Sequence, residues 1–193
     1  MLEPPSGSAL TGGAPLAGLS TDPVLAAIHA RVGGLELKEG FTLLRLEDEQ
    51  RFDLTQVNEE WRRDWREPFR SLLVFAKEEA LAIYYATVPG LAEGMGAQPV
   101  VVVNVHEEPY ALPIASNVDR FFDVYSRYLD ITVKNPDYEE QGPSVLAFPW
   151  GVAEFIARDR PLVERLRVGH FDSLMPKDEE TREWVAQVVG AAV

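Results

Sequence analysis

Cysteine is absent from this chain of 193 residues, and histidine occurs only three times. Without cysteine the chain has no disulfide, no thiolate nucleophile and no cysteine metal ligand, so packing alone must stabilise its fold. The histidines at positions 29, 106 and 170 are too scattered to show the spacing of metal ligands. The segment HEEPY that starts at His106 lacks the second histidine of the zinc motif HExxH. We therefore expect no cofactor.

Motifs for nucleophilic catalysis and nucleotide binding are missing as well. No serine lies in a GxSxG elbow. The glycine-rich loop 89–97 has neither the glycine spacing of a phosphate-binding loop nor a following GK[ST], and we interpret it as a flexible connection. These absences favour a protein that is not an enzyme.

Basic residues are scarce, since 18 lysines and arginines face 31 acidic residues and the formal net charge is -13. Such a surface repels phosphate backbones, so we expect no nucleic-acid partner, whereas a basic protein partner is allowed. The alternative is that the acidity only keeps the protein soluble. The N-terminal segment has no basic region and is broken by proline and glycine, so we expect neither a signal peptide nor a membrane span, and a cytoplasmic location.

The predicted organisation is one domain with two extensions. Residues 1–19 are rich in glycine, proline and alanine and read as a flexible leader. Residues 20–142 carry alternating strand and helix patterns and form the α+β domain. Residues 143–193 read as short helices. We expect this annex to pack on the same domain, because about fifty residues without disulfides or a structural metal rarely fold alone.

A valine-rich segment is the centre of this prediction. Val100–Val103 with Val105 is too apolar for a strand with one wet face, so we expect both of its faces to be covered. A polar turn leads from it to a second strand, 110–115, that pairs back as a hairpin. An amphipathic helix then runs from Val118 to Leu129, and we expect Ser116 and Asp119 to cap it reciprocally.

The other elements follow from periodicity and breakers. We predict helices over 23–32, 52–65, 152–157 and 161–168, a last helix starting near 177, and strands over 41–46, 72–75 and 81–88. His29 is a lone histidine on the first helix, for which we expect a core-edge or surface position. The fold class is therefore α+β, a mixed and mainly antiparallel sheet flanked by helices.

Candidate partner-binding residues are aromatic and acidic. Trp61 and Trp65 share one face of a predicted helix, either as core-capping residues or as an exposed aromatic platform. Clustered carboxylates with two tyrosines form the second group: Glu107, Glu108, Tyr110, Asp137, Tyr138, Glu139 and Glu140. This group reads as a solvated face, as a partner-binding surface or, with His106, as a metal or acid–base site.

Three successive segments, 72–88, 98–109 and 111–129, resemble the SUKH superfamily, which includes Smi/Knr-type cell-wall assembly regulators and bacterial immunity proteins. Its members show a strand with paired tyrosines, here Tyr84 and Tyr85. A valine-rich strand ending near an acidic turn follows, and then an ASxxxFF-type motif that opens a helix. In this chain that motif consists of Ala115, Ser116, Phe121 and Phe122.

The resemblance implies an α+β fold and a non-enzymatic binding module. The bacterial members neutralise cognate toxins, often nucleases, and an acidic surface suits a partner that is basic where it binds phosphate. An immunity-type protein is thus the leading hypothesis. A regulatory or scaffolding protein of the same fold without a toxin partner is the alternative, and a metal-binding protein or hydrolase that uses the clustered carboxylates is the remote one.

Overall fold

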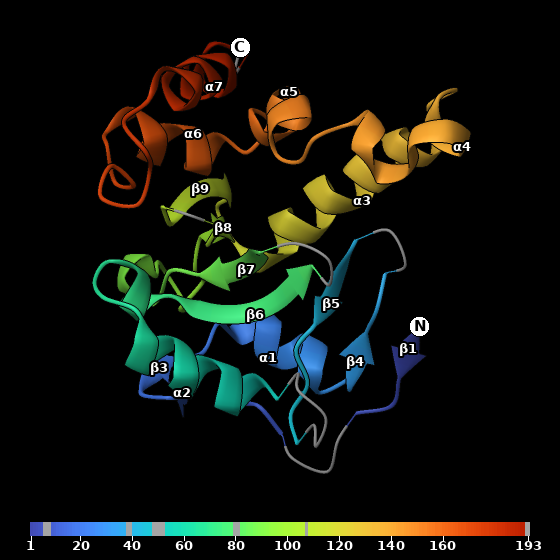
Figure 1. The fold of residues 1–193 in the computed structure, drawn as a ribbon. Coiled ribbons are helices and arrows are strands. Elements are labelled where there is room, and N and C mark those ends of the chain that lie inside the picture. Colours follow the sequence, from blue (N-terminus) through green and yellow to red (C-terminus); the bar gives the residue numbers. More distant parts are fainter. Residues whose placement is uncertain (6–8, 38–39, 48–52, 79–81, 107, 192–193) are drawn as a thin grey trace.

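The computed structural model describes residues 1–5, 9–37, 40–47, 53–78, 82–106 and 108–191. It is an α+β fold around a five-stranded sheet of order β5-β6-β7-β8-β9 (Figure 1). The strands are β5 Phe41–Leu43, β6 Leu73–Glu78, β7 Ile83–Thr87, β8 Val100–Asn104 and β9 Tyr110–Ala115. The helices are α1 Pro23–His29, α2 Leu54–Asp64, α3 Val118–Lys134, α4 Tyr138–Gln141, α5 Ala153–Ile156, α6 Arg160–Arg167 and α7 Glu179–Gly190.

All four pairings in this sheet are antiparallel, so the predicted mainly antiparallel sheet is confirmed and its mixed character is not seen. The strands are neighbours in sequence order, and α2 lies in the long connection between β5 and β6. Such an antiparallel order needs no crossover. Val100, Val101 and Val103 on β8 are fully buried, as expected for a strand that is covered on both faces.

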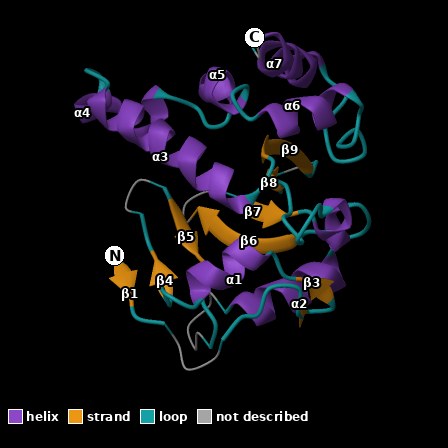
Figure 2. Ribbon diagram, turned by 180° about the vertical axis from the view of Figure 1, so that it is seen from behind, coloured by secondary structure: helices purple, strands orange, loops and turns teal. Residues whose placement is uncertain are grey.

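The paired tyrosines of β7 show which helix covers which face. Successive strand residues point to opposite faces of a sheet. Tyr84 packs against Trp61 of α2 with ring centroids 5.2 Å apart, while Tyr85 packs against Phe121 of α3 at the same distance. Helix α2 therefore lies on one face and α3 on the other, and α1 lies beside α3 (Figure 2).

Helix α3 is capped differently from our prediction and is longer. Its N-cap is Asn117, whose Oδ1 accepts a hydrogen bond from the amide of Arg120 at 2.9 Å. Ser116 instead donates its amide to a carboxylate of the annex, so the expected reciprocal cap of Ser116 and Asp119 is wrong. The helix continues past Leu129 to Lys134, because Thr132 maintains its buried stripe.

Parts of the predicted leader pair with the domain. Strand β1 Leu2–Glu3 pairs with β4 Gly34–Leu35, and β2 Pro15–Leu16 forms a small hairpin with β3 Leu19–Ser20. Leu16 belongs to the core with 8% of its surface exposed. The leader thus contributes apolar packing that its composition did not predict.

The annex packs against the edge strand β9 and the start of α3. The amide of Ala111 on β9 donates to the carbonyl of Leu174 at 3.0 Å, so a segment between α6 and α7 occupies this edge. Phe148 contacts the ring of Tyr125 on α3, with centroids 5.1 Å apart. The annex and the domain therefore share one hydrophobic core.

Two ionisable groups, one buried and one half-buried, also belong to the packing between the elements. His29 on α1 is only 3% exposed, so it is a core residue, and burial lowers its pKa to about 4. Glu78 on β6 accepts a hydrogen bond from the hydroxyl of Tyr85 at 2.6 Å, and burial raises the pKa of this carboxyl. In the described part of the chain, no helix has the length and apolarity needed to cross a membrane.

Candidate partner-binding surface

The predicted partner-binding residues come from three separate parts of the fold. Trp61 and Trp65 belong to α2 and its C-terminus. Glu108 and Tyr110 belong to the connection between β8 and β9, and Glu107 lies outside the described residues. Asp137, Tyr138, Glu139 and Glu140 form the short helix α4 and its N-cap, next to the C-terminal end of α3.

The tryptophan pair is mainly structural. Trp61 is 5% exposed, its ring stacks on that of Trp65 at 5.4 Å, and its Nε1 donates to the carbonyl of Phe69 at 2.8 Å. Because its ring is buried and its Nε1 already has a hydrogen-bond acceptor inside the protein, Trp61 is not available to a partner. Trp65 is half-buried, so the core-capping interpretation describes this pair better than an exposed platform.

The turn between β8 and β9 offers one exposed carboxylate. Glu108 is exposed, while Tyr110 is half-buried and its hydroxyl accepts a hydrogen bond from Nδ2 of Asn104 at 3.3 Å. Asn104 also accepts the amide of His106 at 2.8 Å. Tyr110 therefore closes the hairpin, and of the predicted residues that the structure describes in this turn, Glu108 is the exposed one.

Helix α4 gathers exposed carboxylates. Asp137, Glu139 and Glu140 are exposed, and Tyr138 is half-buried beside them. Within the described chain none of these three carboxylates is part of an ion pair. The outer face of α3 differs, since Asp123 pairs with Arg127 and Asp130 pairs with Lys134. The carboxylates next to the C-terminal end of α3 thus carry uncompensated negative charge, unlike the paired carboxylates Asp123 and Asp130.

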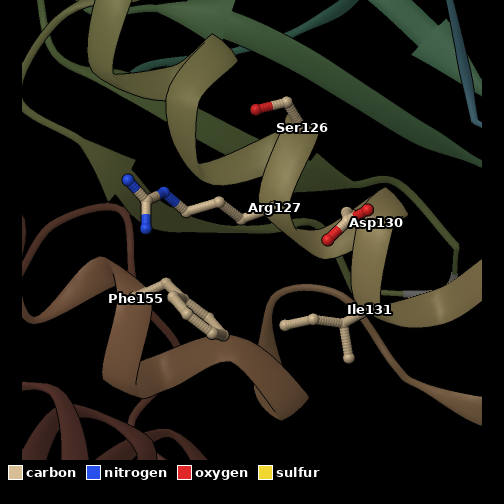
Figure 3. Close-up of a pocket in the computed structure, with 5 residues that line it drawn as sticks. All are labelled: Ser126, Arg127, Asp130, Ile131 and Phe155. Carbon is tan, nitrogen blue, oxygen red and sulfur yellow. The ribbon is translucent and has the colours of Figure 1, made fainter. Parts of the chain in front are cut away.

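A groove lies between α3 and α5, and two of the five residues that line it are apolar. Its lining consists of Ser126, Arg127, Asp130 and Ile131 from α3 and Phe155 from α5, and its volume is about 390 Å³. Figure 3 shows Ile131 and Phe155 on the two sides of the groove, with Arg127 and Asp130 on the α3 wall. Ile131 keeps 37% of its surface exposed, and the guanidinium of Arg158 lies 4.9 Å from the Phe155 ring centroid.

The groove and α4 together have the composition of a binding surface. Ile131 and Phe155 are apolar side chains that a partner can cover, and the charged side chains of Arg127 and Asp130 line the same groove. The i,i+4 ion pairs on α3 are exposed and contribute little stability, so they are free to exchange partners. We call Ile131, Phe155 and the α4 carboxylates Asp137, Glu139 and Glu140 the α3–α4 surface.

The groove residues were missed by the sequence reasoning. The predicted helix ended at Leu129, which left Ile131 in a connecting segment. Phe155 belongs to an annex helix whose position follows only from tertiary packing. One signal was available, because Ile131 and Val133 are apolar but lie off the buried stripe of α3, and both are exposed.

The alternative of a metal or acid–base site requires titratable side chains that lie close together. Among the residues that the structure describes, no group of three or more histidine, aspartate and glutamate side chains could hold a metal ion. The buried carboxyl of Glu78 is held by Tyr85 within the aromatic packing under α3. Burial also raises the pKa of Tyr85, Tyr125 and Tyr128, which keeps these phenols protonated as hydrogen-bond donors.

In comparisons with known proteins, no family model, no curated protein and no solved structure matches this chain.

Proposed function

We propose that this protein is a non-enzymatic binding module that holds a basic protein partner on the α3–α4 surface. Two observations carry this proposal: an open groove lined in part by the apolar side chains of Ile131 and Phe155, and α4 with its N-cap, whose three carboxylates have no ion-pair partner in the described chain. A lysine- or arginine-rich partner compensates these carboxylates, and an apolar side chain of the partner fills the groove.

The overall charge also supports a basic protein partner. A net charge of -13 accelerates the encounter with a positively charged protein and disfavours acidic competitors. The resemblance to SUKH proteins makes an immunity role the leading form of the proposal, with a nuclease toxin as the partner. In that role the carboxylates occupy the basic site where the toxin binds phosphate.

The test is a binding and protection assay with the product of the adjacent reading frame. We expect co-purification of the two proteins, rescue of cells that express that product, and an association rate that falls as salt increases. A purified partner that neither binds nor is neutralised would overturn the immunity form of the proposal.

Charge reversal locates the surface. The double variant Glu139→Lys/Glu140→Lys should weaken binding at least about tenfold, mainly through the association rate. The matched control is Glu59→Lys/Glu60→Lys, which makes the same change at two exposed residues of α2, on the opposite face of the sheet. Equal losses in the two variants would show that net charge, and not the α3–α4 surface, determines binding.

A further inference from the structure

A second apolar hollow lies between α1, β4 and the start of α3, on a different part of the surface from the α3–α5 groove. Its volume is about 370 Å³, and its apolar lining consists of Val24, Ala27, Ile28, Val32, Leu35 and Phe122. Figure 2 shows α1, β4 and the start of α3 around this region. Apolar side chains that line an open hollow of this kind mark a contact site.

Two exposed apolar side chains belong to segments that contact the elements around this hollow. Leu2 is 70% exposed and is the direct antiparallel partner of Leu35, so the two side chains lie on the same face. Met95 is 97% exposed at the tip of the loop that follows β7. A Cβ on Gly96 would lie 3.7 Å from Cδ of Pro23, which places this tip beside the first residue of α1.

The Met95 turn is a built structure and not the flexible connection that we predicted. The amide of Glu93 donates to the carbonyl of Ala97 at 2.9 Å, and the reverse bond measures 3.1 Å. Gly94 and Gly96 have φ values of 52° and 92°, which favour glycine, so this backbone presents Met95 in a defined place. Arg165, with a side chain only 7% exposed, fixes the base of the turn through an ion pair of 2.5 Å with Glu93.

The charges beside the hollow have opposite sign and come from different helices. Arg31 follows α1 and Asp119 lies in the first turn of α3, and both line the hollow and are exposed. In the described chain neither of them forms an ion pair. A patch that presents both a projecting side chain and a hollow, and both a positive and a negative charge, is complementary to itself.

We propose that this patch joins two copies of the chain in a twofold-symmetric dimer. Met95 of each copy enters the hollow between α1 and α3 of the other, and Arg31 of each copy faces Asp119 of the other. A twofold axis closes such a contact, because the same patch serves both copies. Methionine suits this role, since its flexible thioether adapts to irregular apolar hollows. The dimer does not depend on the proposed function and uses none of the residues of the α3–α4 surface.

The first test is the mass of the full chain in solution by sedimentation velocity over a range of concentrations. It is done at physiological ionic strength, where a Debye length of about 8 Å limits the repulsion between two acidic copies. We expect a monomer–dimer equilibrium that Met95→Ser weakens about tenfold. The matched control is Val168→Ser, which removes an exposed valine near the end of α6 and should leave the equilibrium unchanged.

Charge exchange gives the sharper test. Arg31→Glu places two acidic side chains opposite each other in the dimer, and Asp119→Arg places two arginines there, so each variant alone should be a monomer. When the two are mixed, each contact again joins opposite charges, and a heterodimer should form. Arg120→Glu, on a neighbouring residue that does not line the hollow, is the control and should still form the native dimer.

Several results would overturn the dimer. They are a chain that stays monomeric at every concentration, a dimer that Met95→Ser leaves unchanged, and charge variants that do not recover on mixing. If an unrelated protein or an apolar small molecule occupies the hollow instead, the chain will stay monomeric at every concentration. Unchanged thermal unfolding of the variants confirms that they are folded when their masses are compared.

Discussion

The carboxylate of Asp159 connects the annex to the domain through the backbone of Ser116, 43 residues earlier in the chain. Its Oδ2 accepts the Ser116 amide at 2.6 Å, at the point where β9 ends and α3 is about to begin. Its Oδ1 accepts the amide of Leu162 at 3.4 Å and caps α6. Both bonds are buried. One side chain thus satisfies backbone donors of two elements that are distant in the sequence.

Asp159→Ala should therefore lower the free energy of unfolding by about 3 kcal/mol, because it removes a helix cap and leaves the buried Ser116 amide without an acceptor. Urea unfolding measures this change. The comparison is Asp178→Ala, which removes the exposed cap of α7, where Oδ1 accepts the Thr181 amide at 2.7 Å, and its effect should be clearly smaller. Equal effects would mean that the bond to Ser116 contributes nothing.

Substitution of Asn58 on α2 should lower the stability as much as substitution of Asp159, because the side-chain amide of Asn58 hydrogen-bonds to the backbone of strand β6. Its Nδ2 donates to the carbonyls of Leu54 and Val74 at 2.8 Å and 2.7 Å, and its Oδ1 accepts the Val74 amide at 2.8 Å. Asn58→Leu leaves both backbone groups of Val74 buried and unpaired, so we expect a loss of about 3 kcal/mol or more. Gln56→Ala on the same helix is exposed and should change the free energy of unfolding by less than about 1 kcal/mol.

His29 should make stability depend on pH in a weakly acidic range. Its pKa falls from 6.5 in the unfolded chain to about 4 in the fold, so the unfolded state binds the proton first as the pH decreases. Its contribution to stability is complete above pH 6.5 and is lost progressively towards pH 4, by about 3 kcal/mol in total. Between pH 6.5 and pH 4 the free energy of unfolding of His29→Leu should fall by about 3 kcal/mol less than that of the native protein. Urea unfolding at several pH values measures this difference. Parallel pH profiles for the two proteins would contradict this expectation.

Glu78 should make stability depend on pH in the opposite direction from His29. Burial raises its pKa in the fold, so the folded state binds the proton more readily and stability falls as the pH increases through that raised pKa. Glu78→Gln keeps an acceptor for Tyr85 without the buried charge, and it should be at least as stable as the native protein at pH 7, with the advantage shrinking in acid. Tyr85→Phe, which keeps the charge and removes its donor, should cost about 2 kcal/mol at pH 7. A Glu78→Gln variant that is less stable than the native protein at pH 7 would show that the charge itself is needed.

Elements with a local signal were predicted well. Asp22 and Pro23 open α1, with Oδ1 of Asp22 accepting the Val24 amide at 2.8 Å, because a cap and a first-turn proline act over a few residues. The predicted second strand of the central hairpin, 110–115, has the bounds of β9. The last helix, predicted to start near 177, is α7, which begins at Glu179 after its N-cap Asp178. These features depend on neighbours in the sequence and not on the rest of the fold.

Features that depend on distant partners were missed. Leu16 is buried because a hairpin of the leader packs on the domain. No periodicity of apolar residues within 1–19 predicts this burial. Ser116 has the sequence context of a helix cap, but its amide bonds to a carboxylate of the annex. The candidate surface follows the same rule, since Ile131 and Phe155 share a groove only because α5 lies beside α3.

The amino-acid sequence alone determined the acidic charge, the lack of cysteine chemistry, the class of the fold and the segments that become its main strands and helices, because composition and short-range periodicity set these properties. Tertiary structure alone decided which tryptophan is buried, where the carboxylates of α4 remain without ion pairs, and which apolar side chains border an open hollow. Burial and pairing are properties of contacts between distant residues, and those contacts exist only when the chain has folded.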